Sequence, residues 1–412
     1  MLLPILGLLT LIFAIGFQLV LSPLLANLGI IKRQVESVNN ARCRKIDALQ
    51  ACEHTWLHEP SGLLYAACSD PVKRSYWTPA NNKREVKERP RNDYLAIYDT
   101  NAGTTRKVSL VDFASAGNHG QAEINVHGFD IHVGEQSADV APRLDIFMIN
   151  HRPPLGEGGI ELDANKVGAN STIEHFTSNL GGREAQYVKT YFDEEIITTP
   201  NSVVATSSNS FLFTNDHGID KASPLRLLNP FVPLSNIGYC NARRGCKEAY
   251  SPLTFANGIT RGTAQDQYWV ASSADGLFKS FELQADGSLV LGDSVKVGMS
   301  VDNLSTDSKG SIWAAGLTKA LQSVHYMNEF GAIKSSDAAA AAAAKAPSTG
   351  WKLSLNDGKD ALFGQKWKVE KKFEDDGSVA PALTMVVHDA TRNKLFLSGL
   401  STPFILSCDI YE

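Results

Sequence analysis

The stretch LFKSFELQADGSLVLGDSVKV, at residues 277–297, decides the fold class that this sequence predicts. Two runs rich in β-branched, aromatic and other apolar residues flank an Asp-Gly pair, which is a strong short-range signal for a β-hairpin. Similar runs, punctuated by Gly, Asp or Asn, recur at 62–70, 93–100, 143–151, 209–218, 310–317 and 393–400. No amphipathic helical pattern of comparable strength competes with them, so the sequence predicts an all-β protein.

The recurrence of strand pairs along the chain favours one closed arrangement. Many short strands indicate a sandwich, a barrel or a propeller. A sandwich as long as this chain of 412 residues would need to be split, and no linker between two cores is evident. The sequence therefore predicts a single β-propeller domain over residues 32–412. Two segments look inserted into it, a lid-like loop at 216–246 and an Ala-rich insert at 335–350.

The first 31 residues carry no charged side chain. They are long enough to cross a bilayer, which takes about 20 apolar residues. The segment is either a signal-anchor or a cleaved signal peptide, and its long apolar core without a clean cleavage site favours the signal-anchor. Basic residues between 32 and 45 favour the cytosolic side for the chain that follows, whereas the cysteines favour the opposite side.

Six cysteines follow this segment, and none forms a C-x-x-C pair. An even number of cysteines after a signal-like segment indicates disulfides and an oxidising compartment. Sequence alone allows many connectivities; a bond between the first and the last cysteine would fasten the two ends of the folded part. We therefore predict a protein of the secretory pathway, membrane-anchored or extracellular. The preferred pairs are Cys43–Cys408, Cys240–Cys246 and Cys52–Cys68.

Charge and known motifs exclude several classes of function. The chain has 44 acidic against 39 basic residues, a balance that lacks the basic footprint of a nucleic-acid-binding protein. The sequence contains no G-x-S-x-G elbow, P-loop or H-E-x-x-H motif, so the common hydrolase and nucleotide-binding signatures are absent. The expected partners are a small molecule and, through the N-terminal segment, a membrane; the sequence leaves the oligomeric state open.

Isolated acids, amides and histidines end several of the apolar runs. Each alone has an ordinary structural explanation; Asn257, for example, precedes a glycine and could mark a turn. In a closed ring of blades, however, such residues converge on one axis. Two carboxylates and three amides there form an oxygen-only site that suits calcium, and they lack the Cys and His ligands that zinc prefers. The residues are Glu53, Asn201, Asn257, Asp302 and Asn303, with His127 and His151 nearby in the pattern.

Five stretches together resemble the paraoxonase/arylesterase family of calcium-dependent lactonases. They are INVHGF (124–129), MINHRP (148–153), VVATSSNSFLFTNDH (203–217), LTFANGIT (253–260) and VDNLSTDSKGSIW (301–313). The resemblance covers roughly residues 43–335 and 378–412. It implies a six-bladed propeller with calcium in its central tunnel, acting on lactones or aryl esters.

Position by position, the resemblance assigns roles to residues of this chain. It implies that the Cys43–Cys408 pair is the family's terminal disulfide and that His127 and His151 are its catalytic histidine pair. Its catalytic calcium would be held by Glu53, Asn201, Asn257, Asp302 and Asn303.

Departures from the family pattern concern a second, structural calcium. Its carboxylate ligands fall on His54 and Ser202, which leaves the backbone carbonyl of Phe129. We therefore expect one calcium ion, and expect His54 to be a hydrogen-bonded core residue, perhaps bonded to Ser202. Gly316 and Leu317 replace a cysteine and a histidine of the family, so the pocket wall and the substrate preference are expected to differ.

The resulting hypothesis is hydrolysis of a calcium-polarised ester or lactone carbonyl. His127, assisted by His151, would take a proton from the attacking water, a role that suits an imidazole at neutral pH. Asp216 and His217 would lie near the tunnel mouth. The alternatives are a single-metal propeller hydrolase of gluconolactonase type, a metal-free propeller resembling strictosidine synthase, and a non-enzymatic membrane-tethered propeller with structural calcium.

Two sequons in the sequence differ in what they predict. Asn303 lies in the sequon Asn-Leu-Ser, but a residue that binds a metal in a tunnel cannot carry a glycan. Asn170, in a polar stretch ahead of a strand, is the better acceptor. We expect glycosylation at Asn170 and none at Asn303.

Overall fold

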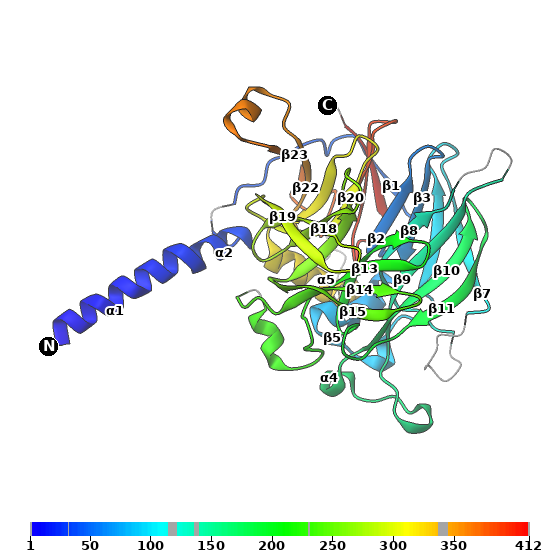
Figure 1. The fold of residues 1–412 in the computed structure, drawn as a ribbon, viewed down its shortest axis with the longest axis horizontal. Coiled ribbons are helices and arrows are strands. Elements are labelled where there is room, and N and C mark those ends of the chain that lie inside the picture. The colour runs from blue at the N-terminus through cyan, green and yellow to red at the C-terminus, as the bar shows by residue number, and fades with distance from the viewer. Residues whose placement is uncertain are drawn as a thin grey trace.

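The computed structural model describes residues 2–31, 33–113, 122–135, 140–229, 231–336 and 345–410. Within these residues the long strands form six four-stranded blades, so the predicted six-bladed all-β propeller is confirmed (Figure 1). The first blade consists of β2 (His54–His58), β3 (Leu63–Cys68), β6 (Tyr94–Asp99) and β7 (Thr104–Val111). The second consists of β8 (Val126–Val133), β9 (Arg143–Arg152), β10 (Asn170–Asn179) and β11 (Glu184–Tyr191). The third consists of β12 (Pro200–Ser207), β13 (Ser210–Asn215), β14 (Ser235–Asn241) and β15 (Gly245–Leu253).

The other three blades follow the same order of strands. The fourth blade consists of β16 (Ala256–Arg261), β17 (Gln267–Ser272), β18 (Leu277–Leu283) and β19 (Leu289–Lys296). The fifth consists of β20 (Ser300–Thr306), β21 (Ile312–Leu317), β22 (Ser348–Leu355) and β23 (Trp367–Asp375). The sixth consists of β24 (Met385–Asp389), β25 (Lys394–Ser398) and β26 (Ile405–Asp409) together with β1 (Cys43–Ile46) from the start of the chain. The first strand of each blade contacts the first strand of the next, and β24 contacts β2, so the ring is closed.

Apolar side chains fill the spaces between neighbouring blades, one buried cluster for each space. Because side chains alternate between the two faces of a strand, a single strand serves two clusters. On β21, Trp313 joins the cluster shared with the sixth blade, whereas Ile312 and Ala314 join the cluster shared with the fourth. The short apolar runs read from the sequence are therefore buried on both faces, which explains why many of them do not alternate with polar residues.

One edge departs from the regular propeller pattern. The outermost strands of the first two blades, β7 and β11, pair in parallel through Ser109–Val111 and Glu184–Gln186. The two blades thus form one eight-stranded sheet. The sequence did not predict this pairing.

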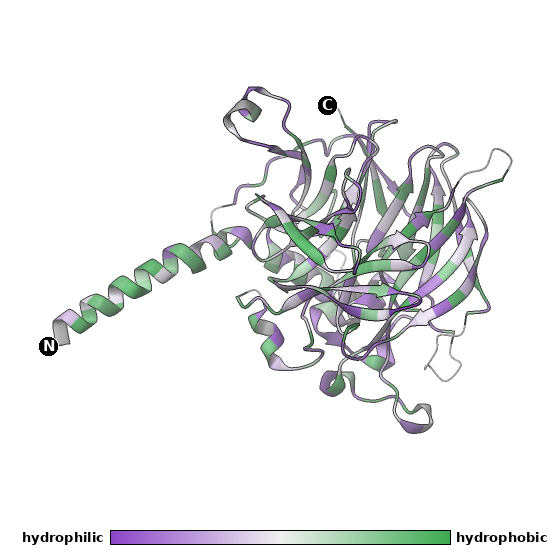
Figure 2. Ribbon diagram, viewed as in Figure 1, coloured by the Kyte–Doolittle hydropathy of each residue, from purple (hydrophilic) through white to green (hydrophobic). Residues whose placement is uncertain are grey.

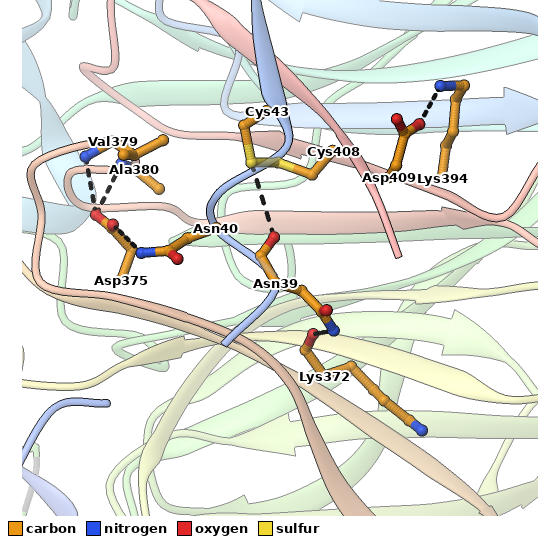
Figure 3. Close-up of a disulfide and its surroundings, with 10 residues drawn as sticks. All are labelled: Asn39, Asn40, Cys43, Lys372, Asp375, Val379, Ala380, Lys394, Cys408 and Asp409. Carbon is orange, nitrogen blue, oxygen red and sulfur yellow. Dashed lines mark hydrogen bonds and ion pairs between the residues drawn. A yellow bond between two sulfur atoms is a disulfide. The ribbon is translucent and has the colours of Figure 1, made fainter. Parts of the chain in front are cut away.

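The two ends of the propeller are fastened together in the sixth blade. Strand β1 pairs with the C-terminal strand β26, and Cys43 lies opposite Cys408 in this pairing. The disulfide between them is flanked by Asn39, whose Nδ2 donates to the carbonyl of Lys372 over 2.8 Å (Figure 3). All six cysteines lie in the described residues. The other four form the two remaining preferred bonds, Cys52–Cys68 and Cys240–Cys246.

The N-terminal segment is a projecting helix with a fixed base. It consists of α1 (Leu2–Gly16), the π-helix η1 (Phe17–Leu21) and α2 (Ser22–Asn27), and α1 projects away from the blades (Figure 1). Among the described residues, one helical segment, Pro4–Asn27, is long enough and apolar enough to cross a membrane (Figure 2). At its base, Asn27 is buried and its Nδ2 donates to the carbonyls of Ala274 and Asp275.

Two excursions leave the blades at the end where the inner strands begin. The first, residues 69–93, contains α3 (Pro71–Arg74), β4 (Trp77–Thr78) and β5 (Lys83–Arg84) with the 3₁₀ turns η2 (Pro79–Asn81) and η3 (Val86–Glu88). The second contains η5 (Pro224–Leu228) and ends where β14 begins at Ser235. The loop expected over 216–246 is therefore shorter, because its second part pairs as regular strand with β13 and β15.

The remaining helices lie in connections between strands. They are η4 (Glu157–Gly159), α4 (Ala164–Val167), α5 (Ala320–Ser336) and η6 (Lys359–Phe363). Helix α5 packs against α3 of the first excursion. The Ala-rich insert expected at 335–350 begins in the last turn of α5 and ends in β22, and its residues 337–344 lie outside the described residues.

Candidate active site

The candidate residues lie where the inner strands leave the regular ladder. Such β-bulges re-aim side chains and recur beside active sites. Glu53 directly precedes β2, and His127, Asn201, Asn257 and the pair Asp302–Asn303 fall within register shifts. These shifts lie at 126–129 in β8, 200–203 in β12, 256–259 in β16 and 301–304 in β20.

Two glycines let the inner strands approach each other beside these residues. A Cβ on Gly128 would lie 2.5 Å from the carbonyl oxygen of Asn201, and one on Gly258 would lie 2.6 Å from the Cα of Asn303. Real Cβ atoms do not approach backbone so closely, so only glycine fits at these positions. The glycines of the VHG and ANG motifs thus bring strands β8 and β12, and strands β16 and β20, into contact at the level of the site.

Two carboxylates are buried in the tunnel. Glu53 accepts hydrogen bonds from Thr384 Oγ1 over 2.7 Å and from Asn303 Nδ2 over 2.9 Å. Burial raises the pKa of Glu53 to about 7, although these two hydrogen bonds and the charge of Arg74 act to lower it. Burial also raises the pKa of Asp302 well above its usual range, and the charge of Glu53 raises it further. Two acidic groups that oppose each other's ionisation make this a place where a cation is favoured.

Three amide oxygens complete the set. Oδ1 of each of the three asparagines is buried without a hydrogen-bond partner among the described residues. Carboxylates orient two of these amides through their Nδ2 atoms. Asn201 Nδ2 donates to Asp216 over 3.2 Å, and Asn303 Nδ2 donates to Glu53. A buried oxygen without a partner costs free energy unless something outside the chain binds it. The asparagines are Asn201, Asn257 and Asn303.

The donor set fits calcium and does not fit zinc. Calcium takes 6–8 oxygen ligands, and this site offers two carboxylates and the three unpartnered amide oxygens, none of the five side chains being more than 7% exposed. In the described part of the chain no group of three or more His, Cys, Asp and Glu side chains is placed to hold a metal ion. A site here depends on the amides for most of its ligands.

The two candidate histidines are neighbours. The ring centroids of His127 and His151 are 5.0 Å apart. His151 Nδ1 is 2.9 Å from Ser171 Oγ, whereas His151 Nε2 and both ring nitrogens of His127 lack partners among the described residues. Burial lowers the pKa of His127 well below its usual range, with His151 and Arg74 adding to the effect, and lowers the pKa of His151 to about 3. Both imidazoles are therefore neutral near pH 7, and the same burial makes each a weaker base than an imidazole in water.

Asp216 connects the asparagine and histidine groups. Its Oδ2 accepts from Asn201, and its Oδ1 is 2.6 Å from His217 Nδ1. Burial raises the pKa of Asp216, but His217 and Arg226 outweigh that effect and hold it at about 2. Asp216 is thus a fixed negative charge that accepts a bond from Asn201 and pairs with His217, and it directly follows β13 beneath the cap.

The two excursions cover this end of the tunnel; the second lies within the lid-like loop expected at 216–246, whereas sequence reasoning missed the first. From the first, Arg74 donates through Nη2 to the carbonyl of Val126, and Trp77 donates through Nε1 to the carbonyl of His151 over 2.9 Å. Arg226 of the second donates to the carbonyl of Pro79 over 2.8 Å and so joins the two. Beneath this cap the space beside His151, Ser171 and Asp216 is about 10 Å³, room for one water molecule. The sequence signal for the first excursion was limited to Asp70-Pro71, a helix-start pattern.

The structure corrects one expectation for the deeper tunnel. His54 is buried, but neither ring nitrogen has a hydrogen-bond partner among the described residues, so the expected bond to Ser202 is wrong. The His54 ring instead packs edge-on against Phe129 with centroids 5.4 Å apart. Burial lowers the pKa of His54 to about 3, because no nearby group compensates for its desolvation. Ser202 Oγ accepts a bond from the backbone N–H of Ile259 over 3.4 Å.

The fold and the site together define a six-bladed propeller with an oxygen-rich, histidine-flanked centre at one end of its tunnel. A family model described as Arylesterase matches residues 163–331. The resemblance expected from the motifs is thereby confirmed for this part of the chain, which contains Asn201, Asn257, Asp302 and Asn303. Glu53, His127 and His151 lie before it. The match supports a hydrolase of esters or lactones in general.

Other comparisons concern the fold. No curated protein matches the chain by sequence. Among solved structures, it is similar to a gluconolactonase from Xanthomonas campestris at 12% identity and a TM-score of 0.45, covering 92% of this chain and 96% of the other. It is similar to a PQQ-bound aldose sugar dehydrogenase from Streptomyces coelicolor at 10% identity and a TM-score of 0.46, covering 90% and 99%. A virginiamycin B lyase from Staphylococcus aureus follows at 11% identity and a TM-score of 0.43, covering 90% and 99%.

Proposed function

We propose that this protein is a calcium-dependent hydrolase of lactones and/or aryl esters. One observation carries the proposal: three buried amide oxygens without partners in the described residues lie with two mutually opposed carboxylates at the same end of the tunnel. The amides alone would be a puzzle in a folded core, because buried polar atoms are nearly always paired. A hard dication that accepts oxygen ligands accounts for both features at once.

The chain's own residues supply the remaining functions. A calcium ion held by Glu53, Asp302 and the three asparagines would supply Lewis-acid polarisation of the substrate carbonyl. His127, neutral and with both ring nitrogens free of partners in the described residues, accepts a proton from the attacking water. His151, held through Nδ1 by Ser171, has an unpartnered Nε2 in the described residues and packs beside His127, which it helps to keep in place.

Substrate entry requires movement of the cap. The candidate residues are all buried, and the space beside His151 holds about one water molecule. A lactone or aryl ester is far larger than a water molecule. We therefore infer that the excursion at 69–93 and the segment around Arg226 separate when substrate enters, with the bonds from Arg226 to Pro79 and Asn82 broken.

The proposed location of the protein in the cell rests on its N-terminal segment and its disulfides. The apolar span Pro4–Asn27 and the disulfides favour a protein of the secretory pathway that is anchored in a membrane by its N-terminal helix. If the anchor is cleaved, the same propeller is secreted. N-terminal sequencing of the mature protein distinguishes the two outcomes: an anchored protein retains residues 2–31, and a secreted one lacks them.

Hydrolysis of a panel of aliphatic lactones, aryl esters and phosphotriesters, with and without calcium, tests the proposal. We expect lactone or aryl ester hydrolysis that a chelator abolishes and added calcium restores. Asp302→Asn should lose it, whereas Asp286→Asn, at an exposed hairpin position, should retain it. Calcium that raises the melting temperature without any hydrolysis would instead support the non-enzymatic tethered propeller. Hydrolysis confined to gluconolactone and independent of His127 would support the gluconolactonase-type alternative.

A further inference from the structure

The excursion at residues 69–93 holds the peptide that precedes His127. Val126 lies directly before His127 on β8, and the excursion binds both polar groups of its backbone. The Val126 N–H donates to Asp93 Oδ2 over 3.0 Å, and the Val126 carbonyl accepts from Arg74 Nη2. Asp93 is 8% and Arg74 1% exposed, so little water competes for these bonds. The backbone beside His127 is thus held by a segment outside the blades.

The same excursion holds the strand that carries His151. Trp77 donates from Nε1 to the carbonyl of His151 over 2.9 Å. The backbone N–H of His151 donates to the carbonyl of Asn125 over 2.9 Å, and Asn125 donates from Nδ2 to the carbonyl of Pro90 over 2.6 Å. Both backbone polar groups of His151 are therefore connected to the excursion, one directly and one through Asn125.

Little else fixes the ring of His127. Among the described residues neither of its ring nitrogens has a hydrogen-bond partner. The register shift at 126–129 in β8 leaves His127 without an opposite residue in β9. Its ring packs beside that of His151, with centroids 5.0 Å apart. The place of the His127 imidazole therefore depends on its backbone and on His151, and the excursion holds both.

The stem of the excursion is itself fastened to the candidate site. Cys68 ends β3 directly before the excursion, and its disulfide partner Cys52 directly precedes Glu53. At the neck, Ser69 Oγ donates to Asp93 Oδ1 over 2.5 Å, which joins the first residue of the excursion to its last. The second oxygen of the same carboxylate makes the bond to the backbone of β8. A stem held in this way moves together with the site and supports it.

We propose that Asp93 and Trp77 are positioning residues for the histidine pair, with Asp93 fixing the backbone at His127 and Trp77 fixing the backbone at His151. These roles rest on the proposed function and deepen it, because they give the excursion a part in the reaction beyond covering the site. A general base works only within hydrogen-bond reach of its proton. A displacement of about 1 Å can cost about a hundredfold in rate, so the loss of one of several supporting bonds should cost less.

Substitution of Asp93 tests its role. Asp93→Leu keeps a similar shape and removes the acceptor for the Val126 N–H, whereas Asp93→Asn keeps an acceptor oxygen. We expect kcat to fall about tenfold in Asp93→Leu and to stay within about threefold of the unmodified protein in Asp93→Asn. KM should change less than about twofold, because in the described part of the chain Asp93 does not line the space beside His151.

Trp77→Phe and Lys87→Met complete the set of variants. Trp77→Phe keeps an aromatic ring in the buried cluster with Ala164 and Ala169, and it removes the N–H that binds the His151 carbonyl. We expect it to lower kcat about tenfold. Lys87→Met, at an exposed position of the same excursion, should leave kcat unchanged.

Labelling of imidazoles with diethyl pyrocarbonate supplies a readout that needs no activity. His127 is 2% and His151 3% exposed, so both should react slowly in the unmodified protein. Peptide mass spectrometry should show labelling at least about threefold faster at His127 in Asp93→Leu and at His151 in Trp77→Phe, because each loosened backbone opens more often. His388, buried on β24, should keep its rate in both variants and is the internal reference.

The outcomes separate this inference from the proposed hydrolysis. Unchanged kcat and unchanged labelling in Asp93→Leu and Trp77→Phe would overturn it. So would a loss in Asp93→Asn equal to that in Asp93→Leu, or an equal rise in the labelling of His388, which would indicate a general loosening of the fold. If the unmodified protein hydrolyses no ester or lactone, the proposed function fails, and the labelling rates alone decide whether the excursion holds the histidines.

Discussion

Asn303 donates a hydrogen bond from Nδ2 to Oε1 of Glu53, 2.9 Å away and 250 positions earlier in the chain. Glu53 directly precedes the inner strand of the first blade, and Asn303 lies on the inner strand of the fifth blade. The bond therefore joins two blades that are separated in the ring by the sixth. It fixes the amide so that Oδ1, which lacks a partner in the described residues, is left for another ligand. The role of the Asp302–Asn303 pair is thus tied to the ring as a whole and not to a local turn.

The first prediction concerns the sequon at Asn303. Its side chain is 1% exposed, so a glycan there would require the tunnel to open. Asn170 is partly exposed at the start of β10. Peptide mass spectrometry of protein from a eukaryotic secretory host should find a glycan at Asn170 and an unmodified Asn303. A glycan on Asn303 would contradict the candidate site itself, and Asn170→Gln provides the matched glycan-free control.

The second prediction concerns the amide ligands. Asn257→Ala removes an oxygen that has no partner in the described structure, and it also removes a bond to Asp302. We expect calcium affinity to fall at least about tenfold, because a hard dication is bound through its count of oxygen ligands. Titration of chelator-treated protein with calcium measures this. Asn209→Ala, exposed in the β12–β13 turn, is the control; equal affinities in the two variants would remove Asn257 from the ligand set.

The third prediction separates the two histidines. His127→Gln should lower kcat by about a hundredfold or more, the usual contribution of a general base, with calcium affinity unchanged. His151→Gln should cost about tenfold, because it acts on His127 through a neighbouring ring. His325→Gln, exposed on α5, should behave as the unmodified protein. Hydrolysis by His127→Gln within twofold of the unmodified protein would exclude His127 as the base.

The fourth prediction concerns the stability that Asp216 contributes. Its folded pKa of about 2 lies below the ordinary value of 3.8. Ionised Asp216 therefore stabilises the fold above pH 3.8, and this contribution is lost as pH falls through 2. We expect Asp216→Asn to lower the free energy of unfolding by about 2 kcal/mol at pH 7, with the difference shrinking between pH 4 and pH 2. Denaturant unfolding at several pH values measures it, and a constant deficit across that range would contradict the ionisation account. The exposed Asp47→Asn should show no deficit.

The sequence predicted the features that depend on local pattern and on the closure of the ring. The strand runs and the three disulfides agree with the structure. Asn201, Asn257 and Asp302 were expected where apolar runs end, and they lie near the starts of the inner strands β12, β16 and β20. In a propeller every blade begins at the same end of the tunnel, so position in the run determines position in the site.

The features that the sequence did not reveal depend on contacts between distant segments. Arg74 and Trp77 reach the backbone of β8 and β9 from an excursion with weak local signals. Asn27 binds the turn that follows β17 across 247 positions, with no motif at either end. His54 was expected to be hydrogen-bonded because it is polar, but the space around it is filled by the ring of Phe129.

The pairing of β1 with β26 sets an order for biosynthesis. Strand β1 leaves the ribosome soon after the N-terminal helix, yet its partners in the sixth blade begin only at Met385. Until then β1 presents an unpaired edge, which invites incorrect association. A nascent chain interrupted before the last blade would thus keep an open ring with β1 unpaired, an edge by which chaperones and degradation enzymes can recognise it as unfinished.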